Sequence, residues 1–271
     1  MEDLAKLENL KIIIKNYEKA TIAFSGGVDS TFLLYVVNSV LDKSNFIAAI
    51  CKSPIRKKSE LEKALLFAKK FDINIKELET NEMSDNNFIM NPADRCYYCK
   101  KHIYSNLIEL SNTLNIPNIF DGTNTDDLNE YRPGLKAIKE LNIKTPLVEA
   151  NINKKDVREL SKYLGLPTWN DISDTCLPTR IEIGTPITEV ELKKVMLAET
   201  FLSNLGFKGF RVRSHINVAR IEFLKDDIKV FFDKNYGDIT NKYFKEIGFK
   251  WVSVDIIGYR NSGELIVNSS L

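Results

Sequence analysis

Long apolar runs are missing from this chain of 271 residues. A helix that crosses a bilayer needs about 20 consecutive apolar residues. No stretch approaches that length, so we expect no membrane span. The segment Met1–Lys6 also lacks the charged and apolar regions with which a signal peptide begins. We therefore expect a cytosolic protein.

An excess of charge of one sign is missing too, because 38 basic and 37 acidic side chains leave a formal net charge of +1. Such a balance gives no overall attraction to nucleic acid or to an anionic membrane. Sulfur and imidazole ligands are scarce, with four cysteines and two histidines. In a reducing compartment, so few cysteines are expected to be thiols, metal ligands or catalytic groups rather than disulfides.

Short apolar segments alternate with segments of helical periodicity over the first part of the chain. We expect buried strands at Ala20–Phe24, Phe46–Ile50, Ile73–Leu78 and Asn118–Asp121, and helices at Ser30–Leu41, Ser59–Phe71, Cys99–Leu114 and between a cap at Asn153 and a stop at Gly165. This alternation is typical of a parallel, doubly wound α/β sheet. Ligands of such sheets bind beyond the carboxyl ends of the strands.

The pattern changes in the last third of the chain. Residues 166–186 are poor in regular signals, and we expect them to form a loop that crosses the active site. A helix capped by Thr188, two alternating strands, a further helix and a last strand follow, at 189–205, 210–215, 218–223, 238–247 and 251–257. We therefore predict an α/β domain over residues 1–186 and a smaller α+β domain over 187–271.

One hexapeptide directly after the first expected strand carries the strongest signal, and we call it the phosphate loop: Ser25-Gly26-Gly27-Val28-Asp29-Ser30. Two adjacent glycines can adopt backbone angles that other residues avoid. Their N–H groups and the start of the next helix form a nest for a phosphate. Asp29 can cap backbone amides or help to hold Mg²⁺. A tight turn without function is the alternative, and the strand-to-helix context argues against it.

The phosphate loop lacks the Gly-Lys-Ser/Thr of a Walker A motif, so no lysine follows the glycines to hold a transferring γ-phosphate. That absence favours chemistry at the α-phosphate of ATP, with pyrophosphate leaving. Asp121-Gly122-Thr123 ends the fourth expected strand at the same edge of the sheet. We expect Gly122 and Asp126 to contact ATP or Mg²⁺, with helix capping as the alternative for Asp126.

Three of the cysteines suggest a joint role. Cys96 and Cys99 form a CxxC pair, and Cys176 follows far down the chain. Spacing alone leaves four interpretations open: a [4Fe–4S] cluster on three thiolates, a zinc site that adds His102, a redox dithiol at Cys96 and Cys99, or merely buried thiols. Cys51 lies in an apolar setting and is expected to be a buried small residue.

The hexapeptide resembles the loop of the PP-loop, or N-type ATP pyrophosphatase, superfamily. The whole chain is similar to the LarE family of sulfurtransferases in this superfamily. Beyond the phosphate loop, the similarity is carried by the segments 121–127, 131–134, 176–180, 211–213 and 219–222. The resemblance implies an adenine nucleotide alpha hydrolase-like fold, ATP and Mg²⁺ as cofactors, and assembly into a homo-oligomer.

The LarE resemblance also implies an activity. ATP activates a carboxylate of pyridinium-3,5-biscarboxylic acid mononucleotide, and sulfur then displaces AMP to give a thiocarboxylate. One branch of the family uses a single cysteine at the position of Cys176. This chain adds Cys96 and Cys99 and resembles the three-cysteine branch, in which the resemblance implies a [4Fe–4S] cluster that receives sulfide or another sulfur donor.

The resemblance assigns a role to two arginines as well. It implies that Arg211 and Arg213 bind the substrate phosphate, which suits the bidentate geometry of a guanidinium. A solvated strand face is the alternative. Arg180 could stabilise charge on the adenylated intermediate, or serve structure only. Glu199 aligns with a family active-site carboxylate, although on an amphipathic helix we expect it to face solvent.

Three other functions remain open at this point. A tRNA thiolase is expected to show a basic face or an added RNA-binding region, and neither is evident. An amidating synthetase of the NAD synthetase type gives no reason for three cysteines. A nucleotide-sensing or iron-sensing binding module would release no pyrophosphate.

Overall fold

The computed structural model describes residues 2–171 and 175–259. The chain divides into two compact units, one of residues 1–82 and 94–173, the other of residues 83–93 and 174–271. The sequence placed a boundary near Pro186 and gave no sign that 83–93 joins the second unit. The Asn91 side chain explains the link, because it donates hydrogen bonds to the carbonyl oxygens of Glu182 and Thr185 at 2.8 and 2.9 Å. Such a contact between distant segments leaves no compositional signal.

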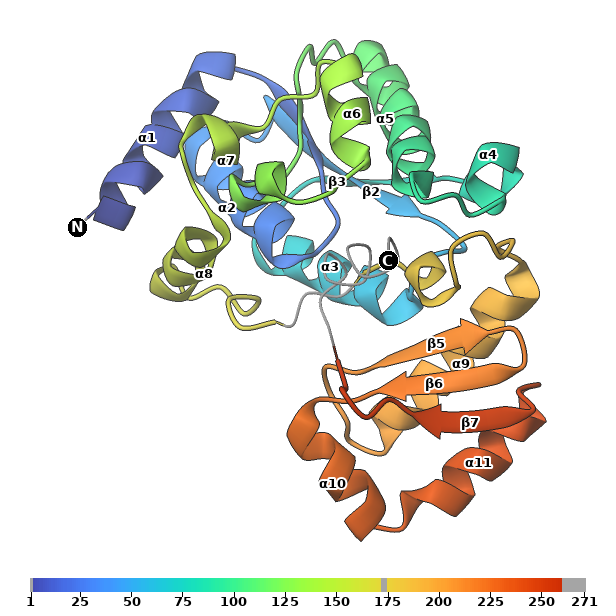
Figure 1. Cartoon of the computed structure of the whole chain (residues 1–271). Helices are drawn as coiled ribbons and strands as arrows, with labels where there is room; N and C mark the ends of the chain where they lie inside the picture. Colours follow the sequence, from blue (N-terminus) through green and yellow to red (C-terminus); the bar gives the residue numbers. More distant parts are fainter. Residues whose placement is uncertain (1, 172–174, 260–271) are drawn as a thin grey trace. The chain divides into compact units, whose positions relative to one another are not determined.

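The first unit contains a parallel sheet in the order β3-β2-β1-β4 (Figure 1). Its strands are β1 (Ala20–Ala23), β2 (Phe46–Lys52), β3 (Ile75–Glu79) and β4 (Ile119–Phe120). In register, Ile22 of β1 faces Ala48 of β2 on one side and Phe120 of β4 on the other. All four strands point the same way, so the loops after them meet at one edge of the sheet.

Helices cover both faces of this sheet, which confirms the doubly wound α/β fold. One face carries α1 (Glu2–Tyr17), α2 (Val28–Val40), α3 (Lys58–Lys70) and α8 (Lys154–Tyr163), and the other carries α5 (Arg95–Thr113) and α6 (Gly134–Glu140). β2 shows the cause: Ala48 and Ile50 pack into the first core, whereas Ala49 packs into the second. α1 was not predicted, although Leu7, Leu10 and Ile14 bury one stripe of it.

Two short elements complete the first unit, η2 (Asp126–Asn129) and α7 (Pro146–Glu149). Two others, η1 (Glu82–Ser84) and α4 (Asn86–Ile89), lie where the chain enters residues 83–93 of the second unit. The predicted cap of α8 is confirmed, because the Asn153 side chain accepts from the backbone N–H of Asp156 and Asp156 reciprocates. α7 occupies a stretch that the sequence described only as a connection. Among the described residues, the longest helices are too short or too polar to cross a bilayer.

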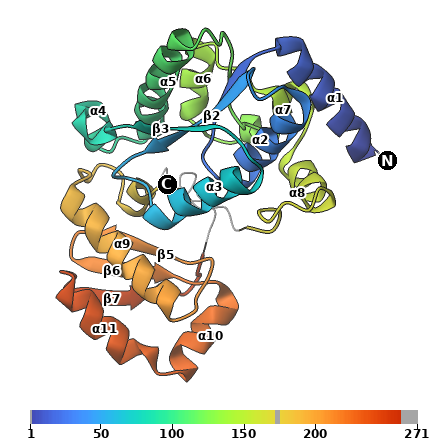
Figure 2. The ribbon, with the colours of Figure 1, turned by 180° about the vertical axis from the view of Figure 1, so that it is seen from behind.

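The second unit contains a mixed sheet in the order β5-β6-β7. β5 (Arg211–His215) pairs antiparallel with β6 (Val218–Glu222), which pairs parallel with β7 (Trp251–Val254). The unit also holds η3 (Leu177–Arg180), α9 (Glu189–Asn204), α10 (Lys225–Asp233) and α11 (Tyr236–Glu246). Figure 2 shows α9 lying along the strands. The Thr188 side chain caps α9 as predicted, accepting from the N–H of Glu191.

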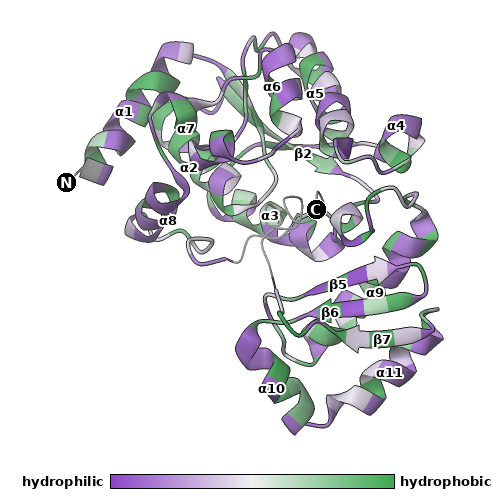
Figure 3. Cartoon of the chain, in the orientation of Figure 1, coloured by the Kyte–Doolittle hydropathy of each residue, from purple (hydrophilic) through white to green (hydrophobic). Residues whose placement is uncertain are grey.

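Alternation gives the second sheet two different faces. Val212, Ala219 and Ile221 point into a core that includes Phe207 and Phe223. The opposite positions of β5 and β6 hold charged side chains, and Figure 3 shows the hydrophilic bands on these strands. This charged face forms part of the candidate site described below.

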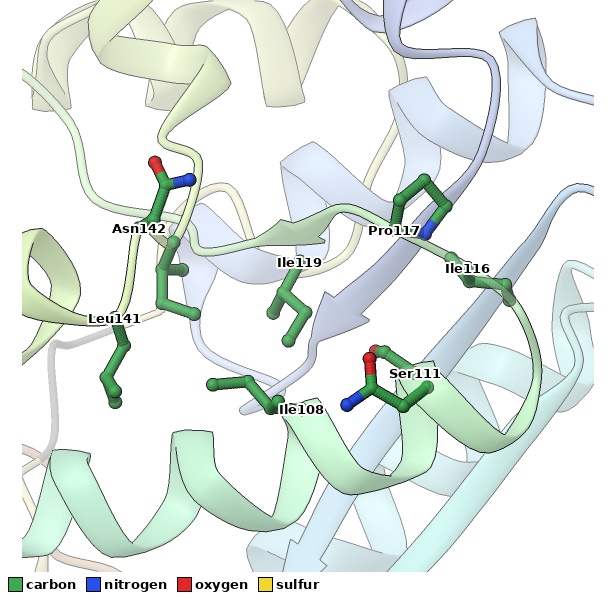
Figure 4. A pocket seen from close by; sticks show the side chains of 9 residues that line it. Ile108, Ser111, Ile116, Pro117, Ile119, Leu141 and Asn142 are labelled. Carbon is green, nitrogen blue, oxygen red and sulfur yellow. The ribbon is translucent and has the colours of Figure 1, made fainter.

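A hollow of about 190 Å³ lies at the amino end of β4, between the second half of α5 and the segment after α6 (Figure 4). It is lined by apolar side chains such as Ile108, Ile119 and Leu141 together with the polar Ser111 and Asn142. Since the phosphate loop follows the carboxyl end of β1, this hollow belongs to the other edge of the sheet.

Candidate functional site

The phosphate loop turns tightly between β1 and α2. Gly26 has a φ of +75°, which favours glycine, and a Cβ there would lie 2.8 Å from the Cβ of Ala64 in α3. Gly27 precedes α2, and its N–H donates to Ser25 Oγ at 3.3 Å. Ser30 Oγ accepts from the Ser25 N–H at 3.2 Å and lies 2.9 Å from Ser25 Oγ. The loop thus places the start of α2, with its unpaired N–H groups, at the carboxyl edge of the sheet.

Gly122 packs directly against the start of α2. A Cβ on Gly122 would lie 2.9 Å from the backbone N of Ser30 and 3.0 Å from its Cα. The glycine is therefore required by close backbone approach, since its φ is not in the left-handed range. The sequence placed Gly122 and the phosphate loop at the same edge, and the structure brings their backbones into contact.

Asp29 meets a lysine that the sequence did not single out. Lys154 Nζ lies 2.5 Å from Asp29 Oδ2, and Asn124 Nδ2 donates to Asp29 Oδ1 at 3.3 Å. The backbone N–H of Lys154, at the start of α8, donates to Asp126 Oδ2 at 3.0 Å. Asp126 therefore caps α8, the alternative we gave for it. A lysine 125 positions away from Asp29 in the chain could not be found from spacing around the phosphate loop.

Asp127, rather than Asp126, is the buried carboxylate of this segment. It is 7% exposed, accepts from the Asn124 N–H at 3.0 Å and pairs with Arg132 at 2.8 Å. Burial raises the pKa of Asp127, and the nearby Asp29 carboxylate adds to the rise. The charges of Asp127 and Asp29 therefore influence each other, and each carboxylate has a cationic partner, Arg132 and Lys154.

Asp121 anchors a second charged group at the end of β4. It accepts from Lys100 Nζ at 2.9 Å, from Tyr104 Oη at 2.5 Å and from the Thr123 N–H at 2.9 Å. Burial alone would raise the pKa of Asp121, but the Lys100 ammonium and these hydrogen bonds outweigh it and lower that pKa to about 2. The carboxylate is thus charged at neutral pH, and it holds Lys100 beside the strand end.

Cys96 and Cys99 lie in the first turn of α5, which begins four residues earlier than predicted. Both side chains are half-buried, and three residues of separation put them on one face of the helix. Tyr97 has a packing role, since its hydroxyl donates to Glu140 at 2.8 Å and its ring lies beneath Lys136. The pair offers two thiol ligands and fits the sulfur side of a metal or cluster site.

Cys51 differs from the other thiols. It lies in β2 and is half-buried, less enclosed than the sequence predicted. Burial, with the nearby Glu82 carboxylate, raises the pKa of the Cys51 thiol to about 11. A thiol with so high a pKa is a poor nucleophile and a poor ligand at neutral pH.

Cys176 in the second unit is exposed and directly precedes η3. The backbone around it is fixed, because the Cys176 carbonyl accepts from the Thr179 N–H at 3.0 Å and from its hydroxyl at 2.7 Å. The described residues include no group of three or more His, Cys, Asp or Glu side chains placed to hold a metal ion. The three cysteines are divided between the two units, two in the first and one in the second.

Arg180 is buried, with 1% of its surface exposed. Its Nε lies 2.7 Å from Glu199 Oε1, and its Nη1 donates to Thr175 and Thr179 hydroxyls at 2.6 and 2.8 Å. Glu199 is 3% exposed, so the expectation that it faces solvent is wrong. The helical pattern of α9 did not distinguish its buried ion pair from a solvated carboxylate.

Arg211 and Arg213 share one face of β5, and both are buried, at 1% and 6% exposure. The solvated-face alternative is therefore wrong. Arg211 donates to Tyr259 Oη at 2.9 Å, and Arg213 Nε donates to Glu222 Oε2 at 3.1 Å. Burial, together with the charges of Arg211 and Arg180, lowers the pKa of Arg213 to about 10. Three guanidiniums thus influence one another inside the second unit.

Glu222 is the acidic partner that the sequence analysis missed. It is fully buried in β6, where it also pairs with Arg220 at 3.0 Å. Arg220 in turn donates to His215 Nε2 at 3.2 Å, which gives that histidine a structural contact. Strand register would not have indicated this pairing, because Glu222 lies opposite Arg211, whereas its partner Arg213 is the diagonal neighbour.

Comparison of the sequence with known proteins identifies the relatives of this chain. Residues 5–91 match the family model described as NAD synthase. An uncharacterized protein of Synechocystis is 40% identical over 262 residues, 96% of this chain and 97% of that protein. An uncharacterized protein of Methanocaldococcus jannaschii is 36% identical over 262 residues, 96% and 98% of the two chains.

A third relative has a described activity. The pyridinium-3,5-bisthiocarboxylic acid mononucleotide synthase of Lactiplantibacillus plantarum is 35% identical over 256 residues, which cover 94% of this chain and 92% of the synthase. The alignment spans both compact units, with the phosphate loop in one and the buried arginines in the other. The chain therefore belongs to the LarE family of PP-loop proteins, the family of this synthase.

Proposed function

We propose that the protein is an ATP-dependent sulfurtransferase that adenylates a carboxylate of a small nucleotide-like substrate and replaces one oxygen of that carboxylate by sulfur. The relationship to the bisthiocarboxylic acid mononucleotide synthase supports this reaction class. The observation that carries the ATP part is the phosphate loop, with Gly26 in a left-handed turn and α2 starting at its end. The absence of a following lysine favours attack at the α-phosphate.

ATP binding is assigned to residues of the first unit. The phosphate chain binds at Ser25–Ser30, where the loop N–H groups and the Ser25 and Ser30 hydroxyls can donate. Mg²⁺ binds with the phosphates beside Asp29, which Asn124 orients. Gly122 contributes to the site because it lets the segment after β4 approach the start of α2. Asp126 contributes by capping α8, the helix that begins with Lys154.

Adenylation turns one carboxylate oxygen of the substrate into part of a good leaving group, AMP. A substrate oxygen forms a bond to the α-phosphorus, and the bond from that phosphorus to the bridging oxygen breaks, so pyrophosphate leaves with the electron pair. A sulfur nucleophile then attacks the carbonyl carbon, and AMP departs with the original oxygen. Only a charged, anionic sulfur is a strong nucleophile in such a step.

We propose Cys96, Cys99 and Cys176 as ligands of a [4Fe–4S] cluster. The donor set fits, since two of the thiols share a helix face and the third is exposed. When bound, such a cluster supplies an open iron that can carry sulfide, which would allow repeated turnover. The contribution of the chain is to present two half-buried thiols on one helix face and one exposed thiol.

The substrate site is assigned to the second unit. Arg211 and Arg213 bind the phosphate of the substrate, and Arg180 stabilises charge on the adenylated intermediate. Their burial beside one another supports this assignment, because burial and the charges of Arg211 and Arg180 lower the pKa of Arg213. An anion would offset this mutual repulsion. We also propose a cytosolic homo-oligomer, as the family resemblance implies.

The test combines iron analysis with turnover. Anaerobically reconstituted protein should bind about four irons and four sulfides per chain, and should release pyrophosphate and AMP only when the carboxylate substrate is added. Cys176→Ser and Cys96→Ser should lose iron and sulfur transfer. Cys51→Ser is the matched control and should keep both, given its raised pKa. One zinc and no iron per chain would exclude the cluster.

An amidating synthetase is the second candidate, favoured by the NAD synthase match over residues 5–91. That match includes the phosphate loop and ends before Cys96. An amidating enzyme would keep its activity with ammonia in the Cys176→Ser variant, whereas a sulfurtransferase would lose thiocarboxylate formation. Mass spectrometry of the product distinguishes an amide from a thiocarboxylate.

A further inference from the structure

Arg56 is a cation at the phosphate loop that neither the motif nor the proposed site accounts for. It lies in the connection between β2 and α3. Its Nη2 donates to the carbonyl oxygen of Ser25, the first residue of the loop, and its Nη1 donates to the Cys51 carbonyl at 3.3 Å. The guanidinium therefore joins the carboxyl ends of β1 and β2, at the edge where the ligand binds.

The guanidinium lies directly beside the first glycine of the loop. A Cβ built on Gly26 would be 3.6 Å from Arg56 Nη2. The positive φ of Gly26 makes the turn that exposes the loop N–H groups. Arg56 is thus placed next to the N–H groups to which a phosphate chain would bind.

The charge of Arg56 has no close counter-ion among the described residues. Both of its hydrogen-bond partners are backbone carbonyls, and Glu60 acts on it only over a longer distance. Two other cations at this edge of the sheet differ, because Lys100 pairs with Asp121 and Lys154 pairs with Asp29. A half-buried guanidinium with neutral partners keeps its positive charge for an anion.

We propose that Arg56 binds the pyrophosphate portion of ATP and stabilises it as the leaving group. The carbonyls of Ser25 and Cys51 fix the plane of the guanidinium, and its remaining N–H groups can donate to phosphate oxygens. As the bond between the α-phosphorus and the bridging oxygen breaks, negative charge grows on pyrophosphate, and Arg56 neutralises it. In this role, Arg56 provides the cation that the phosphate loop lacks, from the connection between β2 and α3. The role rests on the proposed use of ATP.

The test compares Arg56→Gln and Arg56→Lys with Lys58→Gln. Lys58 is a suitable control, since it is a cation two residues away whose side chain is 89% exposed and faces Glu62 at 3.9 Å. In Arg56→Gln we expect the dissociation constants of ATP and pyrophosphate to rise about 10-fold or more, as for loss of a charge-assisted hydrogen bond. AMP binding should change less than about twofold. Arg56→Lys should recover part of the loss, and Lys58→Gln should match the wild type.

Two outcomes would overturn the role of Arg56. If ATP, pyrophosphate and AMP all weaken equally in Arg56→Gln, the residue only supports the loop. If Arg56→Gln binds pyrophosphate like Lys58→Gln, it makes no contact with the leaving group. Failure of the proposed function is a separate result: the wild type would release no pyrophosphate with the carboxylate substrate, while the binding comparison would still decide on Arg56.

Discussion

Asp121 shows how one side chain organises the end of a strand. Four donors surround it, from the Lys100 ammonium, the Tyr104 hydroxyl and the N–H and hydroxyl of Thr123. The sequence identified the segment through its glycine and its position after a strand. It did not indicate that the aspartate would be buried at 7% exposure with a lysine from α5.

The pKa of Asp121, lowered from 3.8 to about 2, predicts a pH dependence of stability. A carboxylate with a depressed pKa contributes its full stabilisation above the unfolded-state value, and the contribution is lost as the pH falls from about 4 towards 2. The contribution is of the order of 2 kcal/mol at neutral pH. Asp121→Asn should remove it and flatten the pH dependence of the unfolding free energy in this range.

Urea unfolding of Asp121→Asn between pH 7 and the acid limit measures this effect. Asp42→Asn serves as the control, because Asp42 is exposed. Equal pH slopes for the wild type and Asp121→Asn would show that Lys100 and Tyr104 do not stabilise the charged carboxylate.

At the scale of elements, the connection after β4 packs against the phosphate loop and the start of α2 through backbone atoms. The residue after β4, Asp121, is followed by Gly122, whose Cα faces the first turn of α2. The left-handed angle at Gly26 and the close approach at Gly122 are different reasons for glycine in one site. At each position an added Cβ would clash with a neighbouring helix, α3 for Gly26 and α2 for Gly122.

Gly122→Ala should therefore disturb the start of α2. Its Cβ would fall 2.9 Å from a backbone nitrogen, which cannot move aside as a flexible side chain can. We expect destabilisation of about 1–3 kcal/mol, as for overpacking, and weaker ATP binding. Thermal unfolding and ATP titration measure the two effects.

Gly237→Ala is the control for Gly122→Ala. Gly237 lies in α11, and its Cβ would meet no heavy atom within 4 Å. That substitution should be neutral or stabilise by up to about 1 kcal/mol through helix propensity. Equal effects of the two substitutions would contradict the close-approach explanation of Gly122.

For the whole molecule, the net charge of +1 conceals a local cluster of buried charges. Among the described residues, the second unit buries Arg180, Arg211 and Arg213 with Glu199 and Glu222. Overall charge excluded a strong general attraction to polyanions, but it could not report how charges are distributed inside one unit. The mutual repulsion of these guanidiniums is the physical basis for proposing an anion site there.

This cluster of buried guanidiniums predicts that inorganic phosphate stabilises the protein. A ligand that binds only the folded state at 100 times its dissociation constant adds about 2.7 kcal/mol, so the melting temperature should rise by a few degrees. Arg211→Gln, compared with its own melting temperature in chloride of equal ionic strength, should show a smaller rise. An undiminished rise in the variant would place the phosphate effect elsewhere.

The sequence by itself determined the parts that depend on local chemistry. Strand and helix alternation gave the doubly wound fold, the phosphate loop gave the anion nest, and Asn153 and Thr188 gave two helix caps, because each is specified by neighbouring residues. Resemblance added the LarE family, which the comparisons confirmed.

Only the tertiary structure decided the partners of the charged residues. Lys154 at Asp29 and Lys100 at Asp121 join different elements of the first unit, and Arg180 and Arg213 find their buried partners on neighbouring elements of the second. Periodicity cannot distinguish a buried carboxylate with an arginine from an exposed one, which is why Glu199 was expected at the surface. Burial and ion pairing depend on which chain segments meet, and that is settled when the sheet and its helices pack.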